Sequence, residues 1–314
     1  MKPIRSLGIA VALLGALGWA APSQAQEYPA KPINWVIPFS PGSGADTFAR
    51  TLITATEQVL GQKIVPVNKD GGGTAIGVAY SLAQAADGYT VFSQSDTVVL
   101  GITGGQWPVK GEDVQPIARI NADYKTLVVP KNSPLKSYKD FVAAAKANPG
   151  SLKVGGVGSK SWSSFFVDKV SKGADIKVTY VPYDGGSGVV SAVLGENIDA
   201  AVVTSSNVNA QVDAGDLRML ALSLGERAAD RPDVPTFVEE GHKDIDGEVL
   251  WRGVFAKAGT PEPVLEKLSA ALQQATKDPR WQEYMKQQRQ QDAYMDHKAF
   301  AEYFKAQLDE YSTE

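Results

Sequence analysis

Short apolar runs alternate with amphipathic segments along most of this chain, and this alternation limits what it can fold into. Helical three-to-four spacing separates most of the runs, as at Tyr138, Phe141, Val142 and Ala145. Such alternation predicts an α/β architecture with mostly parallel sheets. The expected strands are residues 33–39, 64–68, 90–95, 126–130, 152–157, 177–183, 198–203, 217–222 and 249–256.

The last part of the chain has a different pattern. Apolar and aromatic residues recur at helical spacing from Leu265 to Leu308, and we expect them to pack in a core. The chain has 314 residues, enough for two ordinary domains, and contains no low-complexity linker. We therefore expect two domains joined by strands that cross between them and form a hinge.

The first 25 residues have the pattern of a signal peptide. Lys2 and Arg5 precede an apolar run over residues 7–21, and Ser23 and Ala25 are the small residues that a signal peptidase accepts. The alternative is a membrane anchor, but the run is shorter than the roughly 20 residues that a span needs. We expect cleavage after Ala25 and export to the periplasm.

Composition excludes several functions. The chain has no cysteine, so disulfides, thiol catalysis and Cys-based metal sites are excluded. Without Lys2 and Arg5, the mature part has 29 basic and 35 acidic side chains, a net charge of −6. A mildly acidic chain with no basic tract is a poor candidate for binding nucleic acid.

Four glycine-rich turns each follow an expected strand and lead into a helix. They read PFSPGSGAD (38–46), VNKDGGGTAIG (67–77), VGGVGSKSWSS (154–164) and VPYDGGSGVV (181–190). Such turns lie outside the carboxyl ends of strands, where α/β proteins bind ligands. Each can offer free N–H groups and the positive end of a helix dipole. The turns are rich in Ser, Thr and Gly, which favours a site that holds an anion with neutral donors.

Catalytic motifs are weak or absent. GSGADT lacks the third glycine of a dinucleotide fingerprint, and no phosphate-binding loop or nucleophile elbow occurs. The two histidines, His242 and His297, lie outside metal-binding spacings. Asp46 and Arg50 have the spacing of a structural ion pair in the first turn of a helix. We expect a protein that is not an enzyme and has no cofactor or metal.

Several segments together resemble the substrate-binding proteins of tripartite tricarboxylate transporters, the TctC or Bug family. They include YPAKPINWVIPFSPGSGADTFAR, VNKDGGGTAIG, NPGSLKVGGVGS, VPYDGGS, RPDVPTFVEEG and WRGVFAKAGTP, and the likeness covers nearly the whole mature chain. The resemblance implies a two-lobed, type II-like periplasmic binding protein with its ligand cleft between the lobes. On this basis residues 27–124 plus 251–314 form lobe 1, and residues 125–250 form lobe 2.

The resemblance also implies the ligand-binding residues. Main-chain groups of Gly42, Ser43 and Gly44 should face a ligand carboxylate, with Gly72, Gly73 and Thr74 opposite. The other expected ligand-binding residues are Phe39, Pro41, Asp46, Ser95, Ser159, Lys160, Ser161, Trp162, Tyr183, Gly186, Ser187 and Arg252.

Departures from the family's usual turns leave alternatives open. Ser43 replaces a glycine and adds a hydroxyl. Lys160 could pair with a second ligand carboxylate or be a solvated lysine, and Trp162 could wall the cleft or pack in the core. Arg252 could form a bidentate pair with a distal carboxylate or a structural ion pair between the lobes.

The sequence thus predicts a periplasmic protein that captures an organic di- or tricarboxylate and delivers it to the permease of a tripartite transporter. An alternative is a binding protein that closes around its ligand in the same way but signals to a sensor kinase. A third possibility is a secreted hydrolase. We expect a monomer, the usual state of a freely diffusing carrier.

Overall fold

The structure is a computed structural model that describes residues 28–105, 107–159, 161–245 and 249–312. The expected signal peptide and Lys160 lie outside the described residues. The strands are β1 (Ile33–Ile37), β2 (Ile64–Asn68), β3 (Thr90–Ser95), β4 (Val114–Pro130), β5 (Lys153–Val157), β6 (Thr179–Tyr183), β7 (Ala200–Thr204), β8 (Leu217–Leu222), β9 (Val249–Lys257) and β10 (Gln291–Met295).

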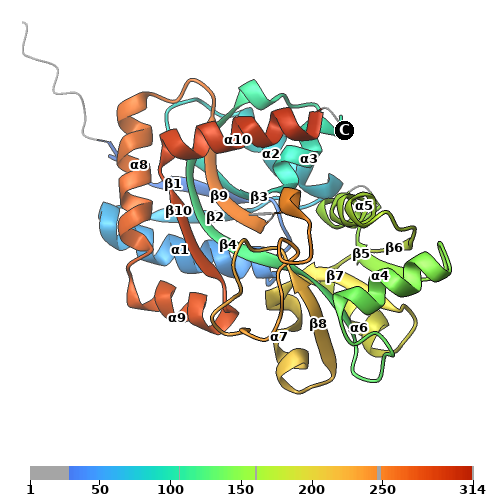
Figure 1. Cartoon of the computed structure of the whole chain (residues 1–314). Coiled ribbons are helices and arrows are strands. Elements are labelled where there is room, and N and C mark those ends of the chain that lie inside the picture. Colours follow the sequence, from blue (N-terminus) through green and yellow to red (C-terminus); the bar gives the residue numbers. More distant parts are fainter. Residues whose placement is uncertain (1–27, 106, 160, 246–248, 313–314) are drawn as a thin grey trace, which may run out of the picture.

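The helices alternate with these strands until β9, after which helices predominate (Figure 1). They are α1 (Gly44–Leu60), α2 (Ala75–Leu82), α3 (Thr97–Thr103), α4 (Tyr138–Ala147), α5 (Trp162–Ala174), α6 (Gly186–Leu194), α7 (Ser205–Asp213), α8 (Glu262–Ala275), α9 (Pro279–Gln288) and α10 (His297–Ser312). No helix among the described residues is long and apolar enough to cross a membrane.

The strands form a sheet in two parts that share β4. In the first part β1 lies between β2 and β3, parallel to both, and β9 runs antiparallel to β3 and β4. In the second part β5 lies between β6 and β7, parallel to both, while β7 and β8 run antiparallel to β4. The pairing of β4 changes between Tyr124, which faces Val249, and Lys125, which faces Thr204.

Two expectations about the strands are wrong. The strand expected at 126–130 is longer and begins at Val114. Its first part was not expected because Gln115, Arg119 and Asn121 interrupt the apolar pattern there. The sheets are mixed rather than mostly parallel, since the crossing strands β4 and β9 run against each other and against their neighbours.

The expectation of helix throughout the C-terminal part is also wrong at one place. The segment QDAYM forms β10, which pairs antiparallel with β4 between α9 and α10. β10 is short and polar, and its place is set by the partner strand, a long-range contact that helical spacing cannot reveal.

Helices cover both faces of each part of the sheet. In the first part α1, α8 and α9 pack on one face around Trp35, Phe48 and Trp281, while α2, α3 and α10 pack on the other around Trp251 and Phe300. In the second part α4 and α5 cover one face, and α6 and α7 cover the other. The two parts touch where α5 meets α10, through an edge-to-face contact between Phe165 and Tyr311 and an ion pair between Lys169 and Glu310.

Candidate functional site

The first two glycine-rich turns begin at adjacent strand ends. Ile37 ends β1 and is paired with Asn68, which ends β2, and the N–H of Lys69 donates to the carbonyl of Ile37 at 2.9 Å. Parallel strands present their carboxyl ends at the same edge of a sheet. The fold therefore brings the turn before α1 and the turn before α2 side by side.

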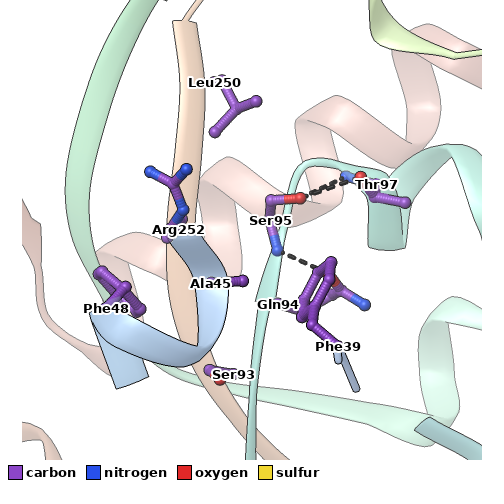
Figure 2. A pocket seen from close by; sticks show the side chains of 9 residues that line it. All are labelled: Phe39, Ala45, Phe48, Ser93, Gln94, Ser95, Thr97, Leu250 and Arg252. Atoms are coloured by element: carbon purple, nitrogen blue, oxygen red, sulfur yellow. Dashed lines mark hydrogen bonds between the residues drawn. The ribbon is translucent and has the colours of Figure 1, made fainter. Parts of the chain in front are cut away.

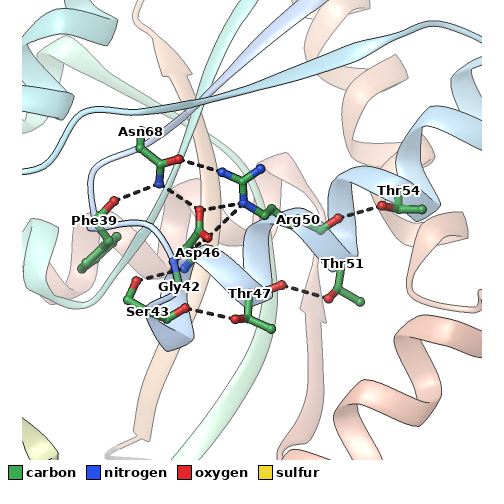
Figure 3. Close-up of polar contacts among 9 residues, drawn as sticks. All are labelled: Phe39, Gly42, Ser43, Asp46, Thr47, Arg50, Thr51, Thr54 and Asn68. Carbon is green, nitrogen blue, oxygen red and sulfur yellow. Dashed lines mark hydrogen bonds and ion pairs between the residues drawn. The ribbon is translucent and has the colours of Figure 1, made fainter.

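Asp46 organises the first turn (Figure 3). Asp46 is 4% exposed, and its carboxylate accepts hydrogen bonds from Arg50 Nε at 2.9 Å, Asn68 Nδ2 at 2.8 Å and the N–H of Gly42 at 2.9 Å. Burial alone would raise the pKa of Asp46, but the hydrogen bonds from Arg50, Asn68 and Gly42 outweigh it and hold the pKa below its usual value. Asp46 thus braces the turn and ties it to the end of β2.

The donors of the first turn are partly used within the protein. Ser43 is the N-cap of α1, and its Oγ accepts from the N–H of Asp46 at 3.2 Å. The N–H of Ser43 donates to Ser40, and that of Gly42 donates to Asp46. Within the described residues, the N–H groups of Gly44 and Ala45 have no acceptor, as is usual at the start of a helix. These two groups are the ones that the turn can offer to an anion.

The second turn has an unusual backbone. Gly71, Gly72, Gly73 and Thr74 all have positive φ, with Thr74 at 76°. A β-branched residue rarely adopts this conformation. The Thr74 hydroxyl accepts a hydrogen bond from Gln94 Nε2 at 2.8 Å, which ties the turn to the end of β3.

A cavity of about 200 Å³ opens beside the first turn (Figure 2). This volume is below the roughly 300–1,000 Å³ of pockets that hold drug-sized ligands, so it suits a small molecule. Its walls come from the turn after β1, the start of α1, the end of β3, α3 and β9. The lining residues are Phe39, Ala45, Phe48, Ser93, Gln94, Ser95, Thr97, Leu250 and Arg252.

Arg252 supplies the charge of this cavity. It stands directly opposite Ser95 across the β3–β9 pair, and its guanidinium lies 5.7 Å from the ring centre of Phe48. Its Nη1 is buried without a hydrogen-bond partner, and among the described residues no carboxylate pairs with it. Within the described part of the chain, Arg252 therefore has no ion-pair partner, and the alternative of a structural ion pair between the lobes has no support there.

The residues expected from the other two turns lie at the ends of β5 and β6. Val157 and Tyr183 are paired there, and the N–H of Gly158 donates to the carbonyl of Tyr183 at 2.8 Å. Ser159 and Ser187 are exposed, and Ser161 caps α5. Of the expected residues from these turns that the structure describes, which also include Gly186, none is among those that line the cavity.

Trp162 is placed in the core of the second part of the sheet. It is 8% exposed and packs with Phe166, and the Lys125 ammonium lies 5.4 Å from its ring centre. This buried aromatic environment agrees with the alternative that Trp162 packs in the core.

The cavity has lining residues that the sequence interpretation missed. Of the expected residues, Phe39, Ser95 and Arg252 line it, while Ala45, Phe48, Ser93, Gln94, Thr97 and Leu250 were not expected. One signal was present: Ser93, Gln94 and Ser95 are consecutive polar residues at the carboxyl end of an apolar strand, and all three are buried. Buried polar groups at such a place indicate a ligand site.

The two-part α/β fold, with glycine-rich turns at the strand ends and a small cavity beside crossing strands, is that of the two-lobed periplasmic binding proteins. A solute-binding protein of the TctC type from Polaromonas has the same fold, with a TM-score of 0.80 and 28% identity over 91% of this chain and 98% of that one. MatC from Rhodopseudomonas palustris, solved with bound malate, has a TM-score of 0.75 and 22% identity over 91% of this chain and 99% of its own, a likeness of fold.

The sequence comparison defines the family. Residues 48–312 match the family described as the tripartite tricarboxylate transporter family receptor, TctC. Protein BugT of Bordetella pertussis is 30% identical over 281 residues, which cover 88% of this chain and 85% of BugT. The chain belongs to the TctC family of solute-binding proteins.

Proposed function

We propose that this protein captures an organic di- or tricarboxylate in the periplasm and delivers it to the membrane permease of a tripartite transporter. The observation that carries the proposal is the Arg252 guanidinium, which lines a small cavity with a buried nitrogen that has no partner. A buried cation is costly unless an anion pairs with it, and Arg pairs well with carboxylates in a bidentate geometry. The family description supports the transporter as the recipient.

Closure would couple binding to delivery. The proposed lobes, residues 27–124 plus 251–314 and residues 125–250, meet where β4 changes its pairing from β9 to β7 and β8. A ligand held by the turns and cavity of lobe 1, and then contacted by the β5 and β6 turns of lobe 2, favours the closed form by its differential affinity for that form. The closed monomer would present the surface that the permease recognises.

A thermal-shift screen of the purified protein tests the proposal. The probes are succinate, glutarate, tricarballylate and citrate, with glutaramide and phosphate as controls. A ligand at 100 times its Kd adds about 2.7 kcal/mol of stability, which raises the Tm by several degrees in a chain of this size. Stabilisation by carboxylates and not by the controls supports the proposal. Stabilisation by phosphate or the neutral diamide alone would refute carboxylate binding.

A further inference from the structure

Thr74 has a backbone conformation that its own helix does not explain. Its φ is 76°, and the other non-glycine residues with positive φ in the described part of the chain, Asp175, Glu196 and Arg289, lie just after helices α5, α6 and α9. A residue in this conformation commonly ends a helix. Thr74 instead precedes α2, and its side chain does not cap that helix. Such strain persists only where the surroundings impose it, and it is common where proteins clamp ligands.

The contact that holds Thr74 comes from Gln94 at the end of β3. Gln94 is 1% exposed, its Nε2 donates to Thr74 Oγ1 at 2.8 Å, and its Oε1 accepts from the N–H of Ser95 at 2.9 Å. Figure 2 shows the amide oxygen of Gln94 turned toward Ser95 and the amide nitrogen turned away from it. Because a backbone N–H can only donate, the bond from Ser95 fixes the orientation of the amide. Thr74 therefore receives a donor.

The hydroxyl of Thr74 is thus an acceptor toward Gln94, and its hydrogen is left for another group. A hydroxyl has one hydrogen to donate and two lone pairs that accept. Within the residues that the structure describes, the bond from Gln94 is the one that this hydroxyl makes, and no group accepts its hydrogen. The hydrogen is available to an acceptor from outside the protein.

This hydroxyl adjoins the candidate site. Gln94, whose amide nitrogen is 2.8 Å from it, lines the cavity together with Phe39 of the first glycine-rich turn. The first and second turns are also tied directly, since Ser40 Oγ donates to Asp70 Oδ2 at 2.8 Å. Thr74 is only half-buried, so a small ligand between the turns can reach its side chain.

From these contacts we propose that the Thr74 hydroxyl is a specificity-determining donor to a ligand carboxylate, and that Gln94 is the positioning residue that directs it. The inference deepens the proposed function and rests on it. A chain of hydrogen bonds with one direction runs from the N–H of Ser95 through Gln94 to Thr74 and then to the ligand. An ionised carboxylate only accepts hydrogen bonds and so matches this hydrogen, whereas an ammonium group has only donors.

Calorimetric titration of succinate, glutarate, tricarballylate and citrate into the wild type and variants of Thr74 tests the inference. Thr74→Ser keeps the hydroxyl and should bind within about twofold of the wild type. Thr74→Val and Thr74→Gly lack the hydroxyl, and both should bind at least about tenfold more weakly, because hydrogen bonds to charged groups are the stronger ones.

The valine and glycine variants separate ligand recognition from a purely structural role. Valine keeps a branched side chain at positive φ, whereas glycine adopts this φ readily, so Thr74→Gly should be the more stable of the two in urea unfolding. Affinity should nevertheless be lost in both. If Thr74→Gly binds as tightly as the wild type does, the hydroxyl is structural and the inference is overturned, while the proposed function stands. If the wild type binds none of the four acids, the proposed function fails and the inference fails with it.

A double-mutant cycle tests the positioning role of Gln94. Gln94→Met removes the donor to Thr74 and should weaken binding in the wild type, but it should have little further effect in Thr74→Val, because Gln94 acts through the hydroxyl. Gln84→Met is the matched control, since Gln84 Nε2 donates to the carbonyl of Tyr80 at 3.0 Å, and it should bind as the wild type does. Equal losses from Gln94→Met in both backgrounds would show that Gln94 does not act through Thr74.

Discussion

The guanidinium of Arg289 donates to Oδ2 of Asp213 at 2.7 Å, and this ion pair joins the end of α9 to the end of α7. Arg231 donates to the other oxygen of Asp213, also at 2.7 Å. α9 packs on the first part of the sheet and α7 on the second, so the pair links the two parts away from their shared strand. Asp213 is thus a charged contact between the proposed lobes.

Asp213→Asn should reduce stability in a pH-dependent way. Hydrogen bonds from Arg289 and then Arg231 lower the pKa of Asp213, so its contribution is present above the unfolded pKa and is lost as pH falls through the folded pKa. The carboxylate is partly exposed, so we expect a loss under about 1 kcal/mol at neutral pH. Thermal unfolding from pH 7 to pH 3 measures it. Asp216→Asn is the control. If the difference in stability between the wild type and Asp213→Asn grows on acidification, the account is contradicted.

Ser43→Ala should affect stability through the cap of α1. The Ser43 Oγ accepts from the N–H of Asp46, and loss of such a cap costs about 1 kcal/mol. Ser43→Asp, which keeps a capping oxygen, should restore most of the stability in urea unfolding. If the aspartate variant is as unstable as the alanine variant, the hydroxyl does not act as a cap.

Asp46→Ala should be more damaging than Ser43→Ala. The change removes the acceptor for Arg50, Asn68 and the N–H of Gly42, and hydrogen bonds to a charged group contribute about 1.5–3 kcal/mol. We expect a loss of about 2–3 kcal/mol in urea unfolding, together with weaker carboxylate binding because the first turn loses its brace. A stable variant with normal affinity would show that Asp46 is dispensable for the turn.

Gly77→Ala should distort the second turn, because a side chain at this position would collide with the neighbouring backbone. A Cβ at Gly77 would lie 2.5 Å from the carbonyl oxygen of Lys69 and 2.8 Å from the Cα of Pro38, so the backbone itself would have to move. Overpacking of this kind costs about 1–3 kcal/mol. Gly185→Ala is the control, because a Cβ there meets nothing within 4 Å. Equal melting temperatures for the two variants would contradict this interpretation.

The alternation of apolar and amphipathic segments was sufficient to predict the α/β class and most strands. It did not reveal the first half of β4, where polar residues interrupt the apolar pattern, or the whole of β10, because both become strands by pairing with distant partners. The antiparallel course of β4 and β9 was also not predicted, because strand direction is set by the same distant pairing. Periodicity reports which face of a segment is buried, and it carries no information on strand direction.

The candidate site was predictable where local sequence controls geometry. The glycine-rich turns follow their strands, and Ser43 and Asp46 have the spacing of a cap and a first-turn acid. Phe48 could not be assigned from local sequence, because it lines the cavity only where the start of α1 lies beside β3 and β9. The pairing of Arg252 with a ligand carboxylate stays a prediction.

Titration of glutarate into the wild type, Arg252→Gln and Arg227→Gln tests the central claim most directly. Arg227 is an exposed arginine paired with Glu239, so its change controls for loss of one positive charge. Loss of one partner of a buried charge pair costs about 2–5 kcal/mol, so Arg252→Gln should weaken binding by at least about 30-fold while Arg227→Gln binds as the wild type does. If Arg252→Gln binds glutarate as tightly as the wild type, Arg252 is not the carboxylate anchor and the account is wrong.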